Sequence, residues 1–481
     1  MKLSRRSFVK MTSQASALAL ASIFLPKGLL ANSKAGNLQK KRHLNILFIL
    51  SDDHSVPYVG CYGNPDLKTP NLDSMAADGM RFDRTYTTAP QCVPSRASLM
   101  SGRSAVDIRM TRFSAPLPAE IIAFPELLRK SGYYTGLIGR TYHLDGQGRF
   151  APEITKRVFE EHNLRTFPRR VDYIDEEKAN LEEFLAKVPA GHPFFLQIGF
   201  SDPHRPFDAK DYEPDPNSLT IPESMPDTPL VRQDLAGHYG EIQRLDDSIG
   251  KTLKLIKDRG LEDNTIVVFM GDNGAALLRS KGTLYEGGLK VPLLIRWPGH
   301  VKGGSVCDVL ISGEDIAPTF LELAGISPPE KMTGISFVNV LEGKPFKGRE
   351  HVFAARGSHA SNLPINTAAF DLGRCVISKR YKLIYNALWQ LPYTPVDFEE
   401  QPFWKDLGRR NAEGTLGPKF SRALFAEHRP MFEIYDLEKD PDEFDNLAGR
   451  PKTADIEKKL KELLQEWMIL NQDYLPLPIE R

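Results

Sequence analysis

Cysteine is scarce in this chain, with four residues among 481 that lie far apart in the sequence. Their spacing matches neither a paired metal-ligand motif nor the dense framework of a disulfide-rich protein. Cys61, Cys307 and Cys375 are therefore predicted to be buried thiols, with a single disulfide as the alternative. Cys92 stands apart because of the residues that follow it.

A net charge of either sign is also missing, because 62 lysines and arginines balance 62 aspartates and glutamates. This balance excludes wholesale electrostatic binding to nucleic acid or to acidic polymers, although it is compatible with a local basic pocket. The hydrophobic content of 41% and the charged content of 26% are typical of globular proteins. A length of 481 residues predicts one large domain and a smaller one.

Long hydrophobic runs are absent except near the N-terminus. The segment Ser4–Lys10 resembles the twin-arginine export motif, and the moderately apolar stretch Met11–Leu30 follows it. We predict a signal peptide at residues 1–31 and a linker at 32–43, and hence a periplasmic or secreted protein. A membrane anchor is the alternative, but a proline and a lysine interrupt the stretch, which favours a signal over a stable span.

From residue 44 onward, apolar runs alternate with amphipathic segments. Leu44–Leu50 is a nearly continuous apolar run, as expected for a strand buried on both faces of a parallel sheet. The other predicted strands are 133–138, 193–200, 265–270 and 291–297, and the predicted helices are 71–79, 124–131, 176–187, 235–259 and 315–324. This alternation predicts an α/β fold with a mostly parallel central sheet flanked by helices.

The pattern changes near Arg349, after which short strands precede a terminal helix. The predicted strands are 351–355, 373–378, 382–386 and 433–437, the predicted helix is 455–470, and residues 391–417 are predicted to form a long ordered loop. We therefore expect a large domain at residues 44–348 and a smaller C-terminal α+β subdomain at 349–481.

One short run carries more chemistry than any other, namely Cys92-Val93-Pro94-Ser95-Arg96. Pro94 has a fixed φ and no N–H group, so it suits the first turn of a helix that Gly102 can end. Cys92 would then lie just ahead of the helix N-terminus, where unpaired N–H groups and the helix dipole favour an anion. Arg96, one turn further on, can reach the same point. The alternative is a buried cysteine beside an ordinary capped helix.

Two acidic clusters follow two of the predicted strands. Asp52 and Asp53 come after the first strand, and Asp272 and Asn273 follow the strand at 265–270. Ligands of open α/β sheets bind outside the carboxyl ends of the strands, so we expect both clusters at one edge. Their hard oxygen atoms suit Ca²⁺ or Mg²⁺. Ordinary capping and turn roles are the alternative for each cluster taken alone.

The run that begins at Cys92 is the C-x-P-S-R signature of type I sulfatases, within the alkaline phosphatase superfamily. The chain resembles this family over residues 44 to 475. The resemblance implies an alkaline-phosphatase-like fold, and oxidation of Cys92 to Cα-formylglycine by a formylglycine-generating enzyme. It also implies one divalent cation, usually Ca²⁺, with Mg²⁺ as the alternative. The implied ligands are Asp52, Asp53, Cys92 in its oxidised form, Asp272 and Asn273.

The same resemblance extends to loops after two other strands. Ser201–Phe207 looks like the family's histidine loop, in which His204 would protonate the leaving oxygen. Ser280–Gly288 is similar to another sulfatase motif, in which Lys281 would bind sulfate together with Arg96. A structural histidine and a solvated lysine are the alternatives.

The sequence departs from the family pattern at Ile138–His143. Sulfatases usually have Gly-Lys-x-His there, whereas this chain has Arg140 in place of the lysine and one extra residue before His143. By resemblance, Arg140 would bind sulfate through its planar guanidinium. His143 would be the base that releases sulfate, and Asp272 would take the proton of the attacking hydroxyl of the hydrated aldehyde.

Within the family, the chain is most similar to N-sulfoglucosamine sulfohydrolases and to bacterial polysaccharide sulfatases. The similarity rests on residues 194–196, 202–205, 381–386 and 403–407. Arg356, His359 and Asn386 are the predicted contacts to the sugar.

We therefore predict an exported sulfatase that hydrolyses sulfate esters, or N-sulfates, of a sulfated oligo- or polysaccharide. Neither a nucleic-acid partner nor a stable membrane anchor is expected. Two alternatives stay open, a phosphodiesterase or phosphonate hydrolase of the same superfamily and a non-catalytic carbohydrate-binding relative. The set of Cys92, Arg96, His204 and Lys281 favours an enzyme over the second of these.

Overall fold

The computed structural model describes residues 44–113, 117–118, 120–141, 157, 161, 171–175, 180–359 and 367–478. All of these residues belong to one compact unit. The predicted signal peptide (1–31), the predicted linker (32–43) and His143 lie outside the described residues. Within the described ranges, no helix combines the length and the apolar character that crossing a bilayer requires.

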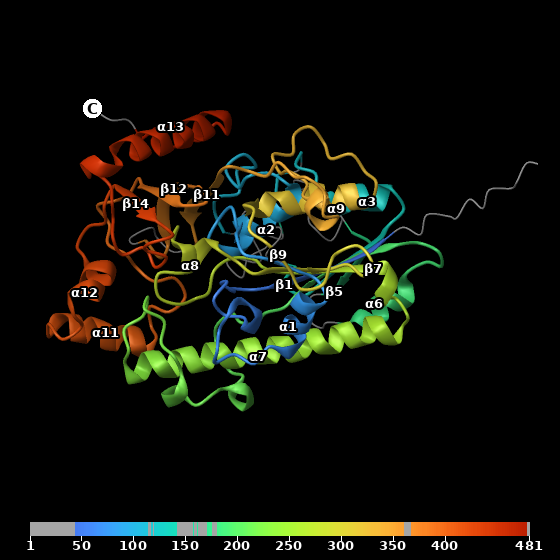
Figure 1. Ribbon diagram of the computed structural model, residues 1–481, viewed down its shortest axis with the longest axis horizontal. Helices are drawn as coiled ribbons and strands as arrows, with labels where there is room; N and C mark the ends of the chain where they lie inside the picture. The colour runs from blue at the N-terminus through green and yellow to red at the C-terminus, as the bar shows by residue number, and fades with distance from the viewer. Residues whose placement is uncertain are drawn as a thin grey trace, which may run out of the picture. The chain divides into compact units, whose positions relative to one another are not determined.

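A central sheet of eight strands organises this unit (Figure 1), in the order β5-β4-β6-β1-β7-β8-β2-β9. Its strands are β1 (Asn45–Ser51), β2 (Met80–Phe82), β4 (Tyr134–Ile138), β5 (Tyr173–Asp175), β6 (Phe194–Gly199), β7 (Thr265–Gly271), β8 (Leu293–Arg296) and β9 (Ser305–Cys307). The strands from β5 to β7 are parallel neighbours, whereas β8 runs antiparallel to β7 and β2. The α/β prediction is confirmed, and the strand expected at 291–297 is present in the reverse direction.

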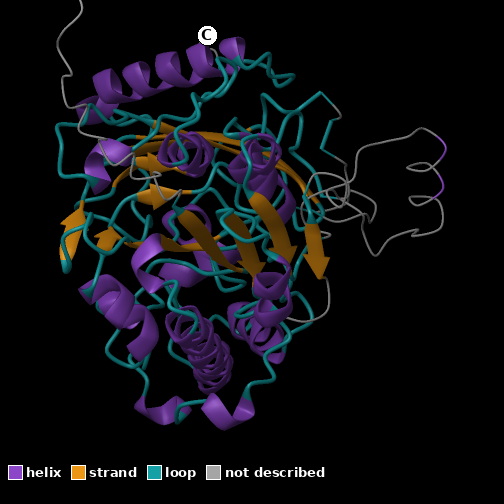
Figure 2. Cartoon of the chain, turned by 90° about the vertical axis from the view of Figure 1, so that its right-hand side faces the viewer, coloured by secondary structure: helices purple, strands orange, loops and turns teal. Residues whose placement is uncertain are grey.

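Helices cover both faces of the sheet, as Figures 1 and 2 show. They are α1 (Pro70–Ala77), α2 (Cys92–Ser101), α3 (Phe124–Lys130), α6 (Leu181–Lys187), α7 (Pro229–Asp258) and α9 (Ile316–Leu323). Successive side chains of a strand point to opposite faces. In the central strand β1, Phe48 therefore joins a hydrophobic core with α2, α3 and α9, and Leu47 joins another with α1, α6 and α7. Burial on both faces explains the apolar run of β1.

Helix α7 begins at Pro229, well before the start that we predicted at Leu235. The side-chain oxygen of Thr228 accepts a hydrogen bond of 3.3 Å from the N–H of Val231, which caps the helix. Pro229 occupies the first helical position, where a backbone N–H would have no acceptor within the helix, so proline loses no hydrogen bond there. The prediction missed these turns because exposed Leu230 and the polar residues after it break the apolar pattern.

The C-terminal residues form an antiparallel sheet of four strands in the order β11-β12-β13-β14. The elements are β11 (Val352–Ser358), β12 (Phe370–Ile377), β13 (Tyr381–Asn386), β14 (Phe432–Asp436) and helix α13 (Ala454–Leu470). One face packs on α13 through residues such as Leu383 and Leu464. The other face packs on the large part of the unit, where Ile384 shares a core cluster with Leu289. The predicted C-terminal α+β subdomain is confirmed.

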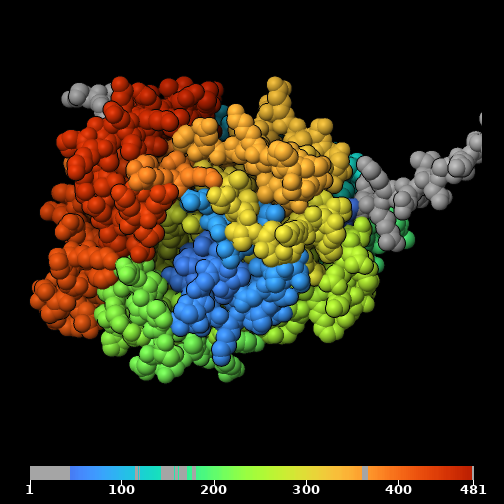
Figure 3. Space-filling model, viewed as in Figure 1, coloured from blue at the N-terminus to red at the C-terminus, as the bar shows by residue number. Residues whose placement is uncertain are grey.

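The long loop predicted at 391–417 is wrong in its second half, which is helical. Helix α11 (Pro402–Ala412) is followed directly by α12 (Pro418–Phe425). Phe403 and Leu407 of α11 are buried in a cluster that includes Leu235 of α7. Helices α11 and α7 are in contact, and in Figure 3 the orange segment lies beside green residues at the surface. Pro402, one of the prolines that favoured a loop, stands instead at the first position of α11, and Pro418 likewise begins α12.

Shorter elements complete the described fold. They are β3 (Thr85–Tyr86), β10 (Ile311–Ser312), α8 (Glu286–Leu289), α10 (Val338–Leu341) and 3₁₀ turns at 60–62, 210–212, 216–218, 262–264, 313–315 and 451–453. All four cysteines are free thiols, so the alternative of a disulfide is excluded. Cys307 and Cys375 are buried as predicted, but Cys61 is only half-buried, because the short turn that carries it lies near the surface.

Candidate active site

The two acidic clusters meet at one edge of the sheet, as the strand order predicts. Asp52 and Asp53 follow β1, Asp272 and Asn273 follow β7, and the two strands are hydrogen-bonded neighbours. The N–H of Asp53 donates to Asp272 Oδ1 (3.0 Å), and Asn273 Nδ2 donates to Asp53 Oδ1 (2.8 Å). These four residues are completely buried. Hydrogen bonds between the clusters thus fix a group of oxygen atoms beside the strand ends.

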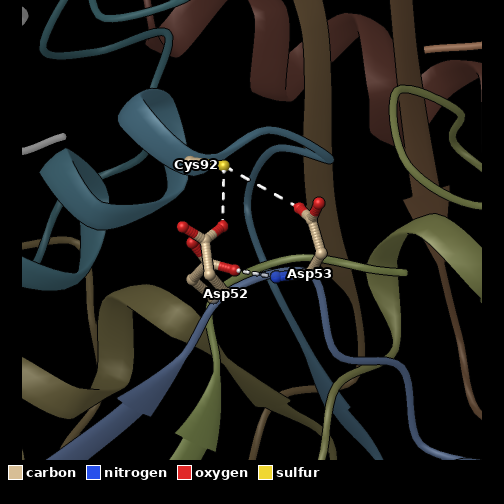
Figure 4. Close-up of side chains that lie close together, drawn as sticks. Asp52, Asp53 and Cys92 are labelled. Carbon is tan, nitrogen blue, oxygen red and sulfur yellow. Dashed lines mark hydrogen bonds between the residues drawn. The ribbon is translucent and has the colours of Figure 1, made fainter. Parts of the chain in front are cut away.

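Cys92 faces this group from the start of helix α2. It is the first residue of the helix rather than the residue ahead of it, because Gln91 takes the cap position with an extended backbone. Its Sγ lies 3.1 Å from Asp52 Oδ1 and 3.9 Å from Asp53 Oδ1 (Figure 4). Burial first, and then the negative charge of Asp52, raise the pKa of the thiol well above its usual value. Gly102 ends the helix with φ 65°, as predicted.

Arg96 reaches back from the second turn of α2 to the same oxygen atoms. Its Nε donates to Asp272 Oδ2 at 2.8 Å, and its Nη2 lies 3.5 Å from Asp52 Oδ2. All three side chains are fully buried. A buried arginine needs such partners, since an unpaired charge in this environment is strongly destabilising. Arg96 therefore links helix α2 to both acidic clusters.

The donor atoms fit a hard divalent cation. Ligand atoms of Asp52, Asp53, Cys92 and Asp272 lie within 4.8 Å of one another. Oδ1 of Asn273 is buried and accepts no hydrogen bond from the described residues, so it is free to bind a cation. Burial raises the pKa of Asp272 to about 7, and the charge of Asp52 adds to this effect. A bound divalent cation would offset the cost of placing these carboxylates together.

Lys281 contacts the other carboxylate oxygen of Asp53 from the one nearest Cys92, and its side chain is almost fully buried. Its Nζ is 2.8 Å from Asp53 Oδ2 and forms a close ion pair with Asp397. The next residue, Gly282, has φ +76°, and a Cβ there would lie 2.4 Å from Val396 Cγ2. Only glycine therefore fits where this loop turns to direct Lys281 inward.

His204 follows strand β6 and completes this side of the site. Its Nε2 lies 3.7 Å from both Asp53 Oδ2 and Asp397 Oδ2, while its Nδ1 forms a short hydrogen bond with the carbonyl of Arg205. A carbonyl only accepts, so Nδ1 carries the hydrogen in the neutral ring. Burial, together with the charge of Lys281, lowers the pKa of His204 to about 4.

Arg140 follows strand β4 with a left-handed backbone (φ 52°). Its Nε lies 2.8 Å from Asp52 Oδ2, so the guanidinium contacts a candidate metal ligand. The companion residue predicted in the same segment, His143, lies outside the described residues.

The three predicted sugar contacts have different positions. His359 belongs to the site, with Nε2 3.4 Å from Asp397 Oδ1 and Nδ1 3.2 Å from Gln91 Nε2. Arg356 and Asn386 line a separate cavity of about 30 Å³ behind Gly282. Asn386 donates to Glu433 Oε1 (2.6 Å), and Arg356 Nη2 donates to carbonyls of residues 367 and 368.

Asp397 is a site residue that the sequence analysis missed. It comes from the C-terminal subdomain, has φ +69°, and contacts Lys281, His204 and His359. Burial opposes its ionisation, but the charges of Lys281 and His359 outweigh burial and hold its pKa well below the usual range. No motif surrounds this aspartate, and 116 positions separate it from Lys281, so only the folded structure reveals the contact.

The mostly parallel sheet, the buried oxygen cluster at its edge and the helix that begins at Cys92 are the features of an alkaline-phosphatase-like fold. The Sulfatase family model matches residues 44–326, and the model of the N-sulphoglucosamine sulphohydrolase C-terminal region matches residues 277–403. The chain therefore belongs to the sulfatase family and is a sulfuric ester hydrolase. The resemblance on which the sequence analysis relied is confirmed.

Curated relatives match along most of their length. An ulvan-active sulfatase of Formosa agariphila is 30% identical over 449 residues, which cover 90% of this chain and 83% of the relative. Human N-sulphoglucosamine sulphohydrolase is 28% identical over 471 residues, which cover 89% of this chain and 91% of the relative.

Solved structures share the fold at lower identity. BT4656 in complex with its substrate D-glucosamine-2-N,6-O-disulfate gives a TM-score of 0.64 at 20% identity, covering 91% of this chain and all of the other. The phosphonate monoester hydrolase of Silicibacter pomeroyi gives a TM-score of 0.68 at 19% identity, covering 90% and 96%. Both confirm the alkaline-phosphatase-like architecture.

Proposed function

We propose that this protein is an exported sulfatase that removes sulfate from a sulfated carbohydrate, as an ester or an N-sulfate. The observation that carries the proposal is the position of Cys92, whose Sγ lies 3.1 Å from Asp52 within a buried cluster of oxygen ligands. The relatives support the substrate class, since one is named for ulvan and another for N-sulphoglucosamine.

Asp52, Asp53, Asp272 and Asn273 would hold the cation, with residue 92 completing the set. Ca²⁺ is the proposed ion and Mg²⁺ the alternative, because all of these protein ligands are hard oxygen atoms. When bound, the cation polarises a sulfate oxygen and stabilises negative charge on it. The unsatisfied Oδ1 of Asn273 supports this assignment.

Residue 92 is proposed to be Cα-formylglycine, made from Cys92 by a formylglycine-generating enzyme. Its hydrate would supply the hydroxyl that attacks sulfur. Asp52 Oδ1 is the carboxylate at hydrogen-bond distance from Cys92 Sγ, whereas Asp272 Oδ2 accepts from Arg96. Asp52 is therefore better placed than Asp272, the base expected from the sequence, to take a proton from residue 92.

The cationic side chains stabilise the charge that develops on the sulfuryl oxygens. Arg96, Arg140 and Lys281 approach the cluster from three different elements and are held by Asp272, Asp52 and Asp53 respectively. Donors that are fixed before the reaction need no reorganisation in the transition state, which makes such stabilisation effective. Each of the three is mostly or fully buried, which strengthens the electrostatic effect.

His204 is proposed to protonate the leaving oxygen or nitrogen through Nε2. Its Nδ1 is held by the carbonyl of Arg205, so Nε2 faces the site. Burial and Lys281 keep the pKa of His204 low in the free protein. A bound sulfate group beside the ring adds negative charge and raises that pKa, so the imidazole takes up a proton when substrate binds.

Desulfation of defined oligosaccharides tests the function directly. Heparan, marine galactan and ulvan fragments are incubated with the purified enzyme, and released sulfate is measured. Turnover of at least one fragment, lost in Cys92→Ala, is expected. Mass spectrometry of residue 92 in active enzyme should show an aldehyde, in which a carbonyl oxygen replaces the thiol. An intact thiol in fully active enzyme contradicts the mechanism.

Fold likeness to a phosphonate monoester hydrolase makes hydrolysis of phosphonate monoesters or phosphodiesters the second candidate. Kinetics on a sulfate ester and a phosphodiester of the same phenol separate the two. A clear preference for the phosphodiester overturns the sulfatase proposal. A carbohydrate-binding protein without catalysis is the remaining alternative, and turnover that depends on Cys92 excludes it.

Export and domain limits complete the proposal. Residues 1–31 would act as a twin-arginine signal and 32–43 as a linker, so the mature enzyme would be periplasmic or secreted. The catalytic domain would comprise 44–348 and the C-terminal subdomain 349–481. Fractionation of cells that express Arg5→Lys/Arg6→Lys and unchanged chains tests export, with retention of only the double variant expected.

A further inference from the structure

Lys281 is shared between two carboxylates, and only one of them belongs to the candidate metal site. Its Nζ contacts Asp53 Oδ2 at 2.8 Å and pairs closely with Asp397 Oδ2. Asp397 enters from the C-terminal subdomain and keeps 28% of its side chain exposed, whereas Asp53 is fully buried. Asp397 therefore lies on the solvent-accessible side of the site, beside Lys281 and His204.

The charges of the described site explain what such a carboxylate does. Three basic side chains and a divalent cation face four carboxylates, because Asp397 joins the three aspartates of the metal cluster. Asp397 lowers the positive charge of this site by one unit, and it lies beside Lys281 and His204. Its negative charge repels an ester group with two negative charges more strongly than one with a single negative charge.

We propose that Asp397 is a specificity-determining residue that selects singly charged esters and rejects doubly charged ones. The inference rests on the proposed sulfatase function and extends it to the charge of the ester group. A phosphodiester also carries one negative charge, so Asp397 acts against phosphate monoesters and not against diesters. The same repulsion acts on substrates that carry a second anionic group beside the scissile sulfate.

Contacts with neighbouring side chains fix the position of the Asp397 carboxylate. Lys281 pairs with Oδ2, and His359 Nε2 lies 3.4 Å from Oδ1. The left-handed backbone at φ +69° is unfavourable for a non-glycine residue, so the loop keeps a strained conformation that presents this side chain. His204 Nε2, 3.7 Å away, places the carboxylate on the side of the proposed leaving group.

Asp397→Asn tests the inference, because the amide keeps the size of the side chain and removes its charge. The ratio of kcat/KM for an aryl phosphate to that for the same aryl sulfate is measured at pH 8, where the phosphate is a dianion. The ratio is expected to rise on the order of tenfold or more, as one unit charge acts at close range. An unchanged ratio, even with lower rates on both esters, means that Asp397 only positions Lys281 and overturns the proposal.

Anion binding gives a readout that does not depend on turnover. Calorimetry of inorganic phosphate and of sulfamate, a monoanion, is compared for the unchanged protein and the variant. Both anions are expected to bind the variant more tightly, phosphate by the larger factor. An equal gain for the two anions contradicts the proposal.

Glu400→Gln is the matched control, since Glu400 lies on the same loop, is 87% exposed and pairs only with Lys405 among the described residues. It should leave unchanged the ratio of kcat/KM for the two aryl esters and the relative affinity for phosphate and sulfamate. Failure of this inference can be distinguished from failure of the proposed function. If the unchanged enzyme releases no sulfate from any fragment, the proposed function fails, while the anion-binding comparison still decides the role of Asp397.

Discussion

Arg140 and Asp52 form an ion pair between the ends of β4 and β1, with Nε 2.8 Å from Oδ2. The arginine stands where sulfatases usually have a lysine, and its φ of 52° directs the side chain toward the metal cluster. Asp52 Oδ1 is also 3.1 Å from Cys92 Sγ, so the pair connects Arg140, a proposed sulfate-binding side chain, to the candidate metal ligand nearest the proposed nucleophile.

Replacement of Arg140 tests whether the guanidinium stabilises the transition state. Arg140→Ala is expected to lower kcat/KM on a sulfated oligosaccharide by about 10²- to 10³-fold, the typical effect of losing one donor. Arg140→Lys should retain more activity than the alanine variant, because it restores the charge without the fork geometry. Arg259→Ala, at the exposed end of α7, serves as the control. Equal rates in all variants would remove Arg140 from the mechanism.

A chelator should destabilise the protein as well as inactivate it. Asp52, Asp53 and Asp272 are fully buried and close together, so removing the cation leaves their repulsion uncompensated. With free Ca²⁺ at about one hundred times its Kd, the linkage contribution is about 2.7 kcal/mol. Thermal unfolding with and without EDTA measures it, and re-addition of Ca²⁺ should restore both Tm and activity.

Asn273→Ala removes a proposed ligand, Oδ1, which accepts no hydrogen bond from the described residues. It also removes the hydrogen bonds that Nδ2 donates to Asp53 Oδ1 and to the carbonyl of Gly274, so the dependence of Tm on Ca²⁺, and not Tm alone, is the readout. It should raise the Ca²⁺ concentration needed for half-maximal stabilisation. A Tm that ignores both EDTA and this substitution argues against a bound cation.

The unmodified Cys92 thiol should be inert in the folded protein. Burial and the neighbouring Asp52 raise its pKa well above the usual value, and only a thiolate reacts quickly with alkylating reagents. Protein produced without the maturation enzyme is treated with iodoacetamide at pH 8, and residue 92 is analysed by mass spectrometry. Labelling is expected only after denaturant is added. Rapid labelling of the native protein would show that the site opens.

The parts of the site that were predictable lie on short segments with strong local signals. Asp52 and Asp272 follow apolar strands, and the order of parallel strands places both at one edge. Cys92 and Arg96 are one helical turn apart, so their common direction follows from local geometry.

The parts that were missed depend on contacts between distant segments. Asp397 acquires its partners only when the C-terminal subdomain packs on the loop of Lys281, and no local pattern encodes that docking. Helix α11 was missed because its stability comes from burial of Phe403 and Leu407 against α7 rather than from its own composition. The reversal of β8 likewise depends on its pairing with β7 and not on its residues.

Buried His54 should make the fold sensitive to acid. Burial lowers its pKa to about 4 and outweighs the hydrogen bond of 2.7 Å that Nε2 donates to the carbonyl of Tyr58, so the ring is neutral at pH 7. An unfolded histidine has a pKa of about 6.5. The unfolded chain therefore binds a proton first, and stability that is present above pH 6.5 is lost as the pH falls toward 4, by about 3 kcal/mol.

Denaturant unfolding between pH 7 and pH 4 measures this loss. His54→Gln should flatten the dependence on pH, whereas His428→Gln, at an exposed position, should not. If His54→Gln and the unchanged protein lose stability in parallel, His54 is not the cause.

All ten residues of α2 are buried, and Cys92 is among them. A modifying enzyme cannot reach a segment that is buried in the folded protein, so the proposed oxidation of Cys92 would have to occur before this helix packs. The fraction of chains that carry formylglycine would then depend on the rate of oxidation relative to the rates of synthesis and folding. A host in which this chain folds faster would then yield folded protein with a smaller fraction of active molecules.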